Sequence, residues 1–400
     1  MRPYLPARAP RLALRPDRER RLWSRSLRRL WPVACAAPLL GAVLSPPGPA
    51  VAGVPSLSRL YVFGDSLSDN GNSGVISSNA ASFPPIFPPP PYNGARFSNG
   101  KVAAEYLWQA FNPSGPTLQA SLQGGTNFAV GGATSGVENF IQYSDFPIAP
   151  ALKAAYAGRG NAWQLDQFGS PSFDPDTSLF MVWMFPNDPF TFFANGGLGV
   201  GTFDGNTSPA GPAAIVPTAV SNIIGSILEL AGKGARNFLV PNTPDLGLIP
   251  EFIGTGLQGT FSDLSDKFNT ELALKLDELS ASRPDLDIVS FQVDDLLAEV
   301  RTNPGAYGFS NVTQRCLANI AATPCSNPET YLFWDGTHPT TAGHSLIGQR
   351  FYQATYEPVP APLPLVGGLA AMGWSRRLRQ RLRLRSRRTS RSCAGQCPAD

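Results

Sequence analysis

The apolar run from Leu179 to Met184 restricts the possible folds of this chain more than any other segment. A strand without polar alternation is buried on both faces, as in a parallel sheet that helices cover on each side. Apolar runs at 237–240 and 287–291 also have the character of strands, and helical patterns at 217–231 and 261–280 precede them. This alternation predicts a doubly wound parallel sheet.

Two further strands are expected earlier in the chain, from Leu57 to Phe63 and from Thr126 to Val130. The prediction is therefore a three-layer α/β/α fold, with a five-stranded parallel sheet in an order that resembles flavodoxin and with helices on both faces. Between these two strands, Asn99 is expected to cap a helix whose apolar face begins at Val102. The prolines at 84, 85 and 88–91 exclude a helix or a central strand from the segment before Asn99.

Residues 1–52 have the composition of an export signal. An arginine-rich segment is followed by an apolar stretch from Leu30 to Leu44 and by the small residues Ala50-Val51-Ala52. We expect cleavage before Gly53 and export of the protein. A twin-arginine signal at Arg28-Arg29 is a looser match to the sequence.

The formal net charge of +3 conceals an acidic central region. Of the 32 basic residues, 19 lie within 2–29 and 376–391, whereas only three of the 29 acidic residues lie in the two ends. The central region therefore carries 13 basic and 26 acidic residues. Because the positive charge belongs to terminal segments outside the expected fold, no nucleic-acid partner is predicted.

Residues 358–400 are expected to form a sorting tail. The sequence Val359-Pro360-Ala361-Pro362-Leu363-Pro364-Leu365 is followed by a short apolar run to Trp374 and then by arginines. This tail resembles the PEP-CTERM sorting signals of Gram-negative bacteria, which implies sorting or processing machinery as a partner. The alternative is a marginal membrane anchor, which predicts a similar periplasmic, cell-surface or extracellular location.

Between these ends, residues 53–357 are expected to form one domain that contains Cys316 and Cys325. A disulfide between them is predicted because they are close in sequence and the protein is expected to be exported. A zinc site would need more ligands than this segment offers, so neither a metal nor a cofactor is expected.

The strand that begins at Leu57 ends in Phe63-Gly64-Asp65-Ser66, where apolar residues change abruptly to small polar ones. Such a turn places Ser66 beyond the carboxyl end of a buried strand, where ligands bind in parallel sheets. A serine becomes a nucleophile when an adjacent base takes its proton. Without such a base, Asp65 and Ser66 would be ordinary turn residues.

The only histidines of the chain, His338 and His344, both follow Asp335 closely. His338 comes three residues after Asp335 on a turn stiffened by Pro339, so the carboxylate can face the imidazole and fix its tautomer. His344 lies in a segment expected to be helical and is interpreted as a structural or surface residue. A metal site formed by both histidines is the alternative, although no carboxylate cluster accompanies them.

Gly132 and Asn187 follow the strands at 126–130 and 179–184, and are therefore expected at the same sheet edge as Ser66. The backbone N–H of Gly132 and the side-chain amide of Asn187 could both stabilise a developing oxyanion. Each alone would be an ordinary turn residue, but together with the serine and the histidine they predict an acyl-transfer site. The glycines between 196 and 201 lack the spacing of a dinucleotide-binding turn.

These motifs resemble those of the GDSL family of SGNH hydrolases, in its extracellular esterase and lipase branch. The similarity spans Leu57 to Tyr352, and five segments carry it: 63–72, 96–100, 127–133, 244–247 and 335–339.

The resemblance implies that Ser66 is the nucleophile and that Asp335 and His338 activate it. It also implies an oxyanion hole formed by the N–H groups of Ser66 and Gly132 and by the Asn187 amide. The expected function is hydrolysis of carboxylic esters through an acyl-serine intermediate, with a lipid, a phospholipid or an acylated glycan as substrate.

One segment departs from the family pattern, because the usual Gly-x-Asn-Asp is Phe185-Pro186-Asn187-Asp188 in this chain. Pro186 is expected to force Phe185 into an extended conformation and to remove a backbone donor, which would narrow or displace the oxyanion site. The alternative function is therefore a surface protein that has this fold, has lost the chemistry and binds glycan or matrix.

Overall fold

The computed structural model describes residues 57–80, 84–201 and 211–356. Within these residues the main sheet has four parallel strands in the order β1 (Arg59–Gly64), β2 (Ser178–Trp183), β3 (Asn237–Pro241) and β4 (Asp287–Phe291). All six residues of β1 pair with β2, from Arg59 opposite Ser178 to Gly64 opposite Trp183. Since the strands are parallel, their carboxyl ends meet at one edge of the sheet.

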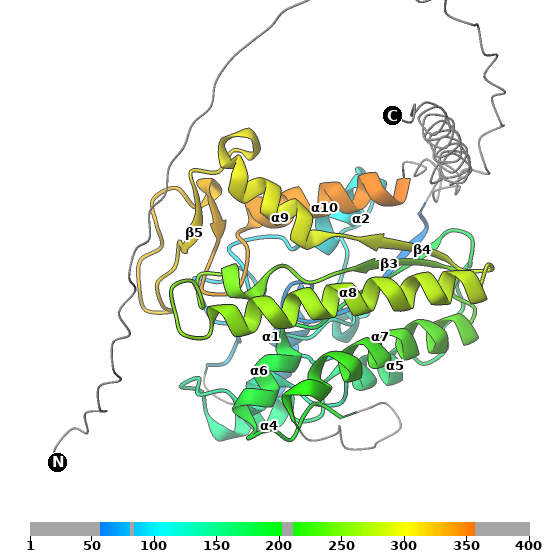
Figure 1. Ribbon diagram of the computed structural model, residues 1–400, viewed down its shortest axis with the longest axis horizontal. Coiled ribbons are helices and arrows are strands. Elements are labelled where there is room, and N and C mark those ends of the chain that lie inside the picture. Colours follow the sequence, from blue (N-terminus) through cyan, green and yellow to red (C-terminus); the bar gives the residue numbers. More distant parts are fainter. Residues whose placement is uncertain (1–56, 81–83, 202–210, 357–400) are drawn as a thin grey trace, which may run out of the picture. The chain divides into compact units, whose positions relative to one another are not determined.

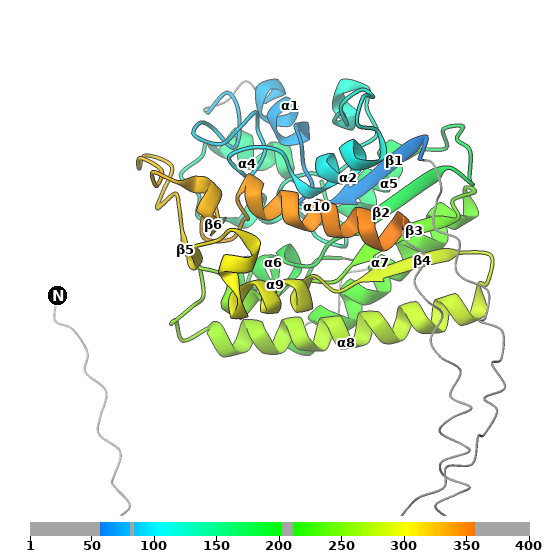
Figure 2. The same cartoon turned by 90° about the horizontal axis from the view of Figure 1, so that it is seen from above.

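Helices cover both faces of the sheet, as Figure 1 shows. Helices α2 (Ala103–Phe111), α9 (Val293–Thr302) and α10 (Thr341–Tyr356) lie on one face, and α5 (Asn161–Phe168), α7 (Ile215–Gly232) and α8 (Gln258–Ser282) lie on the other. Figure 2 shows α2 and α10 packed side by side. The other helices are α1 (Asn72–Asn79), α3 (Phe140–Tyr143), α4 (Pro150–Tyr156) and α6 (Asn187–Ala194), with 3₁₀ turns at Ser121–Gln123, Pro212–Ala214, Leu246–Leu248, Pro304–Tyr307 and Pro328–Thr330.

The apolar strand β2 lies at the centre of the core, and all six of its residues are buried. Phe180 of β2 stacks on Tyr61 of β1, with ring centroids 4.9 Å apart, and packs against Phe238 of β3. The structure thus confirms a parallel sheet with helices on both faces.

The segment Pro212–Gly232, which includes α7, is long and apolar enough to cross a membrane by length and composition alone. In this fold one side of the helix is part of the protein core, because Ala219, Ile223 and Ile227 are almost inaccessible to solvent. This is the ordinary environment of an amphipathic core helix.

The prediction of a fifth strand at Thr126–Val130 is wrong, although the segment runs parallel to β1. Three backbone hydrogen bonds join it to β1, among them Phe128 N–H to the Val62 carbonyl at 2.7 Å. The next bond of a parallel ladder would join Gly64 N–H to the Phe128 carbonyl, but Gly64 N–H donates to Gln164 Oε1 at 2.9 Å instead. This side-chain bond interrupts the ladder, although the segment still leads to the same sheet edge.

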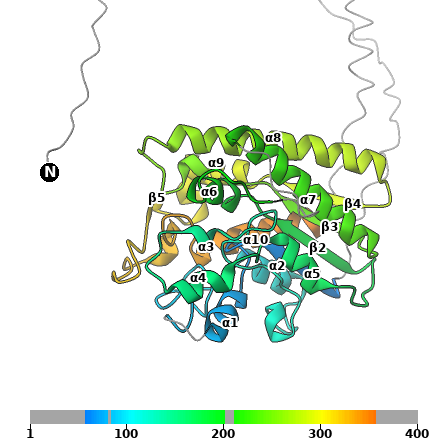
Figure 3. The ribbon, with the colours of Figure 1, turned by 90° about the horizontal axis from the view of Figure 1, so that it is seen from below.

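A second, two-stranded parallel sheet pairs β5 (Asn311–Arg315) with β6 (Tyr331–Phe333). It continues beyond the strands, because Leu317 N–H donates to the Trp334 carbonyl at 2.7 Å. β6 leads directly into Asp335. Figure 3 shows β5 and α6 at the same end of the main sheet.

Asn99 does not cap the helix that follows it, contrary to the prediction. α2 begins after Val102, whose N–H donates to the side chain of Glu105 at 3.0 Å. The Asn99 Oδ1 instead accepts a hydrogen bond from the N–H of Thr341, the first residue of α10, at 2.8 Å. An asparagine side chain can satisfy any helix N-terminus within reach, and the packing of α2 against α10 decides which one.

The predicted export signal at 1–52 and the predicted sorting tail at 358–400 lie outside the described residues.

Candidate active site

Ser66 lies in the turn that follows β1, at the carboxyl edge of the sheet. The N–H groups of Ser68 and Asp69 donate to the Asp65 carbonyl at 3.1 and 2.9 Å, and the Asp65 carboxylate accepts a bond from Leu67 N–H at 2.9 Å. This tight turn orders the residues on both sides of the serine. Ser66 is buried, with 7% of the residue's surface exposed.

His338 approaches Ser66 from the other end of the chain. Its Nε2 lies 2.8 Å from Ser66 Oγ, and its Nδ1 lies 2.7 Å from Asp335 Oδ2. The loop is closed by a bond from Trp334 N–H to the His338 carbonyl at 2.8 Å, and α10 begins three residues after His338. The structure therefore brings together the three residues that the sequence suggested as a nucleophile and its activating pair.

The Asp335 carboxylate is surrounded by donors. Oδ1 accepts hydrogen bonds from the N–H groups of Thr337 and His338 at 2.8 and 2.7 Å, and Oδ2 accepts one from the Tyr92 hydroxyl at 2.7 Å. Burial alone would raise the pKa of Asp335, but His338 and these backbone N–H groups outweigh it and hold the pKa below its ordinary value. Asp335 is therefore a carboxylate at neutral pH, next to the imidazole. Tyr92 was not singled out from the sequence.

Gly132 and Asn187 lie at the same edge as Ser66. Asn187 is the first residue of α6, and its amide Nδ2 lies 3.2 Å from both Asp65 Oδ2 and the Ala133 carbonyl, so it is next to a neighbour of Ser66 and a neighbour of Gly132. Among the described residues, none accepts a hydrogen bond from the backbone N–H of Ser66 or Gly132. These two N–H groups and the Asn187 amide are the hydrogen-bond donors that we expected at the carboxyl edge of the sheet, next to Ser66.

Only glycine fits at position 132. Its φ is 76°, and a Cβ atom there would lie 2.6 Å from Asn139 Oδ1 and 2.8 Å from Ile141 Cγ1. The carbonyl of Gly132 accepts a hydrogen bond from Phe140 N–H at 2.7 Å, which ties the turn to the start of α3. The backbone of this turn is therefore held in one conformation.

The expected extended conformation of Phe185 is wrong. Its φ is 147°, a region that glycine enters freely and residues with a Cβ enter rarely. The ring is fully buried and stacks on Phe268 of α8, with centroids 3.9 Å apart. The ring therefore points into the core, and the peptide keeps the glycine-like geometry that brings Asn187 to the sheet edge.

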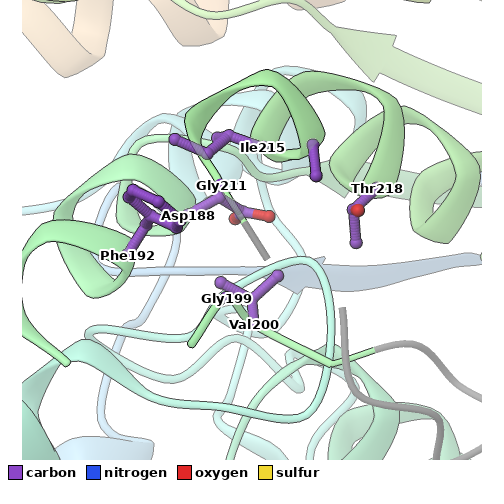
Figure 4. A pocket seen from close by; sticks show the side chains of 8 residues that line it. Asp188, Phe192, Gly199, Val200, Gly211, Ile215 and Thr218 are labelled. Atoms are coloured by element: carbon purple, nitrogen blue, oxygen red, sulfur yellow. The ribbon is translucent and has the colours of Figure 1, made fainter. Parts of the chain in front are cut away.

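Two buried carboxylates near the site were not assigned a role from the sequence. Burial raises the pKa of Asp65 to about 7, although hydrogen bonds from Leu67 and Asn187 oppose the shift. Burial likewise raises the pKa of Asp188 to about 7, while its bonds from Ser135 lower it and the charge of Asp65 adds to the increase. Asp188 also lines a small pocket with Phe192 and Ile215, which Figure 4 shows.

His344 lies on α10, is fully buried, and accepts a hydrogen bond at Nδ1 from Ala103 N–H at 3.3 Å. Burial, with the nearby His338, lowers its pKa to about 3, so the ring is neutral. A neutral ring that bonds to α2 fits the structural interpretation of this histidine. Within residues 57–80, 84–201 and 211–356, no group of three or more His, Cys, Asp or Glu side chains could hold a metal ion.

A disulfide joins Cys316 to Cys325. Cys316 N–H donates to the Phe333 carbonyl at 3.1 Å, so the bridged loop is attached to β6 two residues before Asp335. Cys316 also packs with Leu317 and Trp334 in a small apolar cluster, against which Tyr92 and Cys325 lie. The disulfide is therefore a neighbour of the segment that carries Asp335.

Comparison with known proteins gives one family match, over residues 60–351, to a model described as GDSL-like Lipase/Acylhydrolase. A GDSL esterase/lipase of Arabidopsis thaliana is 24% identical over 354 residues, covering 75% of this chain and 87% of its own. Acetylajmalan esterase 2 of Rauvolfia serpentina is 27% identical over 328 residues, covering 72% of this chain and 88% of its own.

Among solved structures, a gut microbial diltiazem-metabolizing enzyme matches with a TM-score of 0.33 and 12% identity, covering 76% of this chain and 48% of that one.

Proposed function

Because the chain belongs to the GDSL-like lipase/acylhydrolase family, it is an ester hydrolase of the GDSL esterase/lipase type, and we propose that it acts through a covalent acyl-enzyme at Ser66. The observation that carries this proposal is the line of contacts from Ser66 Oγ to His338 Nε2 at 2.8 Å and from His338 Nδ1 to Asp335 Oδ2 at 2.7 Å. A serine hydroxyl is a weak nucleophile, and this arrangement supplies the base that it needs.

In the first half of the reaction, Ser66 Oγ attacks the ester carbonyl carbon while His338 Nε2 takes the hydroxyl proton. Asp335 stabilises the imidazolium that forms and keeps Nδ1 protonated, so that Nε2 is the basic nitrogen. The tetrahedral intermediate then expels the alcohol, which takes its proton from His338. The acyl group remains on Ser66.

The oxyanion of that intermediate is stabilised by the N–H groups of Ser66 and Gly132 and by the Asn187 amide. Donors fixed in advance are worth more than water, because they do not reorganise as charge develops. Support comes from the rigid Gly132 turn. The two hydrogens of the Asn187 amide point at Asp65 Oδ2 and the Ala133 carbonyl, both at 3.2 Å, and the amide gives up one of these long bonds when it donates to the oxyanion. In the second half, water attacks the acyl-serine, His338 takes its proton and then returns one to Ser66, and the carboxylic acid leaves.

A fluorophosphonate probe tests this mechanism, because it labels only an activated serine. We expect labelling at Ser66, loss of labelling and of short-chain ester turnover in Ser66→Ala, and retention of both in His344→Gln. Loss of one member of such a unit typically costs several orders of magnitude in rate. Folded protein that is not labelled, or equal losses in His338→Gln and His344→Gln, would refute the assignment.

We further propose that the substrate is an ester of a lipid, a phospholipid or an acylated glycan. The proposal rests on the family and on the acylhydrolase chemistry of the site, since specificity in such folds lies in surface loops. Turnover of a panel that comprises acetylated xylan, a phosphatidylcholine and a series of p-nitrophenyl esters of increasing acyl length, which share one leaving group, would identify the class. Turnover of none of the three would reject it.

We also propose that the protein is exported and resides in the periplasm, at the cell surface or outside the cell. The support is the sequence of residues 1–52 and the tail at 358–400, together with the Cys316–Cys325 disulfide, which is typical of oxidising compartments. Amino-terminal sequencing of mature protein from the native host is expected to begin at Gly53. Full-length protein recovered only from the cytoplasm would contradict this location.

A further inference from the structure

The Tyr92 hydroxyl donates to Asp335 Oδ2 at 2.7 Å, the same oxygen that faces His338 Nδ1. The two residues are 243 positions apart in the chain. We propose that Tyr92 is a positioning residue of the active site, which fixes the Asp335 carboxylate and through it the orientation and basicity of His338. The proposal rests on the roles proposed above for Ser66, His338 and Asp335.

Tyr92 completes the hydrogen bonding of the carboxylate. An ionised carboxylate offers about four lone-pair positions. Two are used at Oδ1 by the N–H groups of Thr337 and His338, at 2.8 and 2.7 Å. The other two, at Oδ2, are used by Tyr92 and by His338 Nδ1, which lies 2.7 Å from Oδ2 and also 3.0 Å from Oδ1. With all four occupied, the carboxylate cannot rotate without losing bonds to the backbone, whereas loss of the tyrosine hydroxyl leaves Oδ2 with His338 alone.

Tyr92 is itself held firmly. Its ring meets the ring of Trp334 edge to face at 6.2 Å, and its backbone N–H donates to the Pro89 carbonyl at 3.1 Å. Trp334 immediately precedes Asp335, so the ring and the hydroxyl of Tyr92 contact two consecutive residues. This double contact defines the position of the phenol relative to the carboxylate.

The residues after Tyr92 run along the same loop. The Phe97 ring lies 5.3 Å from the His338 imidazole, and Ser98 Oγ donates to the Pro339 carbonyl at 2.9 Å. Asn99 then bonds to the first residue of α10, as described above. Residues 92–99 thus pack in order against residues 335–341, and Tyr92 is the member of this segment that touches the catalytic carboxylate.

Other charged groups near this pair do not replace the tyrosine. Arg315 of β5 acts on Tyr92 electrostatically and is paired with Glu251 at 3.3 Å. Asp65 on the β1 turn and His344 on α10 interact electrostatically with His338. Burial and the charge of Asp335 raise the pKa of Tyr92, so the phenol is protonated at neutral pH and acts as a donor to the carboxylate.

The sign of the effect follows from the donor role. A hydrogen bond to Oδ2 stabilises the carboxylate anion, so it lowers the affinity of the Asp335–His338 pair for a further proton. Without this bond the pair takes up the proton at higher pH. The inactive form, in which His338 is protonated, would then persist to higher pH. The Asp335 carboxylate, which would keep its other hydrogen bonds, would also be less well aligned with the imidazole.

The test is Tyr92→Phe in the mature enzyme, which keeps the ring and its packing against Trp334. We expect kcat to fall by roughly 3- to 30-fold with KM unchanged, and the acidic limb of the kcat/KM profile to move to higher pH by roughly half a unit or more. Tyr143→Phe is the matched control, because it removes a similar bond from Tyr143 to Glu138 Oε2 at 2.9 Å outside the site, and it should change neither.

A purely structural role for Tyr92 would lower the melting temperature or raise KM without moving the acidic limb, and that result would overturn the proposal. In the background of Asp335→Asn, Tyr92→Phe should cost no further activity, because its effect is transmitted through Asp335. If Tyr92→Phe lowered activity in the Asp335→Asn background as much as it does in the wild-type enzyme, that result would also overturn the proposal.

A measurement without turnover separates this proposal from the proposed function. The chain has only two histidines, so the ring signals of His338 and His344 can be assigned by NMR with the His344→Gln variant. Tyr92→Phe should move the titration of the His338 signal to higher pH even if no ester is found that the enzyme cleaves. An unchanged titration in an active enzyme would refute the role of Tyr92 and leave the proposed function standing.

Discussion

Replacing Phe185 by alanine and, separately, by glycine tests whether the chain stores strain beside the active site. Phe185 has a φ of 147°, and a residue with a Cβ in such a region typically costs about 1–3 kcal/mol. Its buried ring stacks on Phe268. Both substitutions remove the ring, but only glycine also relieves the backbone.

The loss of ring packing and the relief of backbone strain differ in size, and this difference determines the order of stability of the variants. Loss of a buried phenylalanine ring costs about 3–5 kcal/mol, more than the strain returns, so both variants should be less stable than the natural chain. At an unstrained position alanine is more stable than glycine by about 0.4–1 kcal/mol, because glycine has more freedom in the unfolded chain. At position 185 we expect this order to be reversed, with the glycine variant more stable by about 1 kcal/mol.

Urea unfolding followed by circular dichroism measures the difference in unfolding free energy. An alanine variant equal to or more stable than the glycine variant would refute the strain. Both variants are expected to retain ester hydrolysis while folded, since Asn187 is held by its own bonds to Asp65 and to the Ala133 carbonyl. A glycine variant that is stable but inactive would show that the ring supports the oxyanion site directly.

Three further predictions concern the surroundings of the site. Burial lowers the pKa of His344 to about 3, below its unfolded value of 6.5, so the unfolded chain takes up a proton first and the free energy of unfolding falls as the pH decreases from 6.5 toward 3. His344→Gln should therefore lose less unfolding free energy than wild type between pH 6.5 and 4. Parallel pH profiles of the two proteins would contradict this. Replacement of Cys316 and Cys325 by alanine opens a ten-residue loop and should lower the free energy of unfolding by about 2–3 kcal/mol. We expect kcat to fall under conditions in which the sheet is still folded, because the loop beside Asp335 is less well held. Free thiols at both positions in exported protein, found by non-reducing peptide mapping, would remove the basis for this expectation. Gly132→Ala should reduce both the free energy of unfolding and kcat. Gly124→Ala is the control, because Gly124 has a φ of 84° and no atom lies within 4 Å of the added Cβ, so it should lose only the backbone contribution of about 1 kcal/mol in unfolding experiments. Equal effects of the two substitutions would argue against the tight turn at Gly132.

Features carried by short stretches of sequence could be predicted. The apolar run of β2 implied burial on both faces, and that requirement implies a parallel sheet with helices on each side. Ser66 at the end of β1 and the pair Asp335 and His338, three residues apart, were visible because the chemistry of each depends on its neighbours in the chain. The pairing of His338 with Ser66 was implied only by the resemblance to the family, because no local pattern relates two residues so far apart in the chain.

Features that depend on the choice among partners could not be predicted. Asn99 has the same side chain whether it caps α2 or α10, and the N–H of Gly64 can donate either to a neighbouring strand or to the side chain of Gln164. The local sequence permits both choices, and the packing of distant segments selects one. Phe185 similarly adopts a conformation that its own preferences oppose, because the core accommodates the ring against Phe268.

The sequence by itself thus determined the type of sheet and the residues capable of the chemistry, since burial pattern and residue type are local properties. The tertiary structure alone decided how those residues are oriented, and Tyr92 is the clearest case. Nothing near it in the chain indicates a role, and its bond to Asp335 exists only because residues 92–99 pack along the loop that carries the histidine. A hydrogen bond about 2.7 Å long requires alignment that only the assembled core provides.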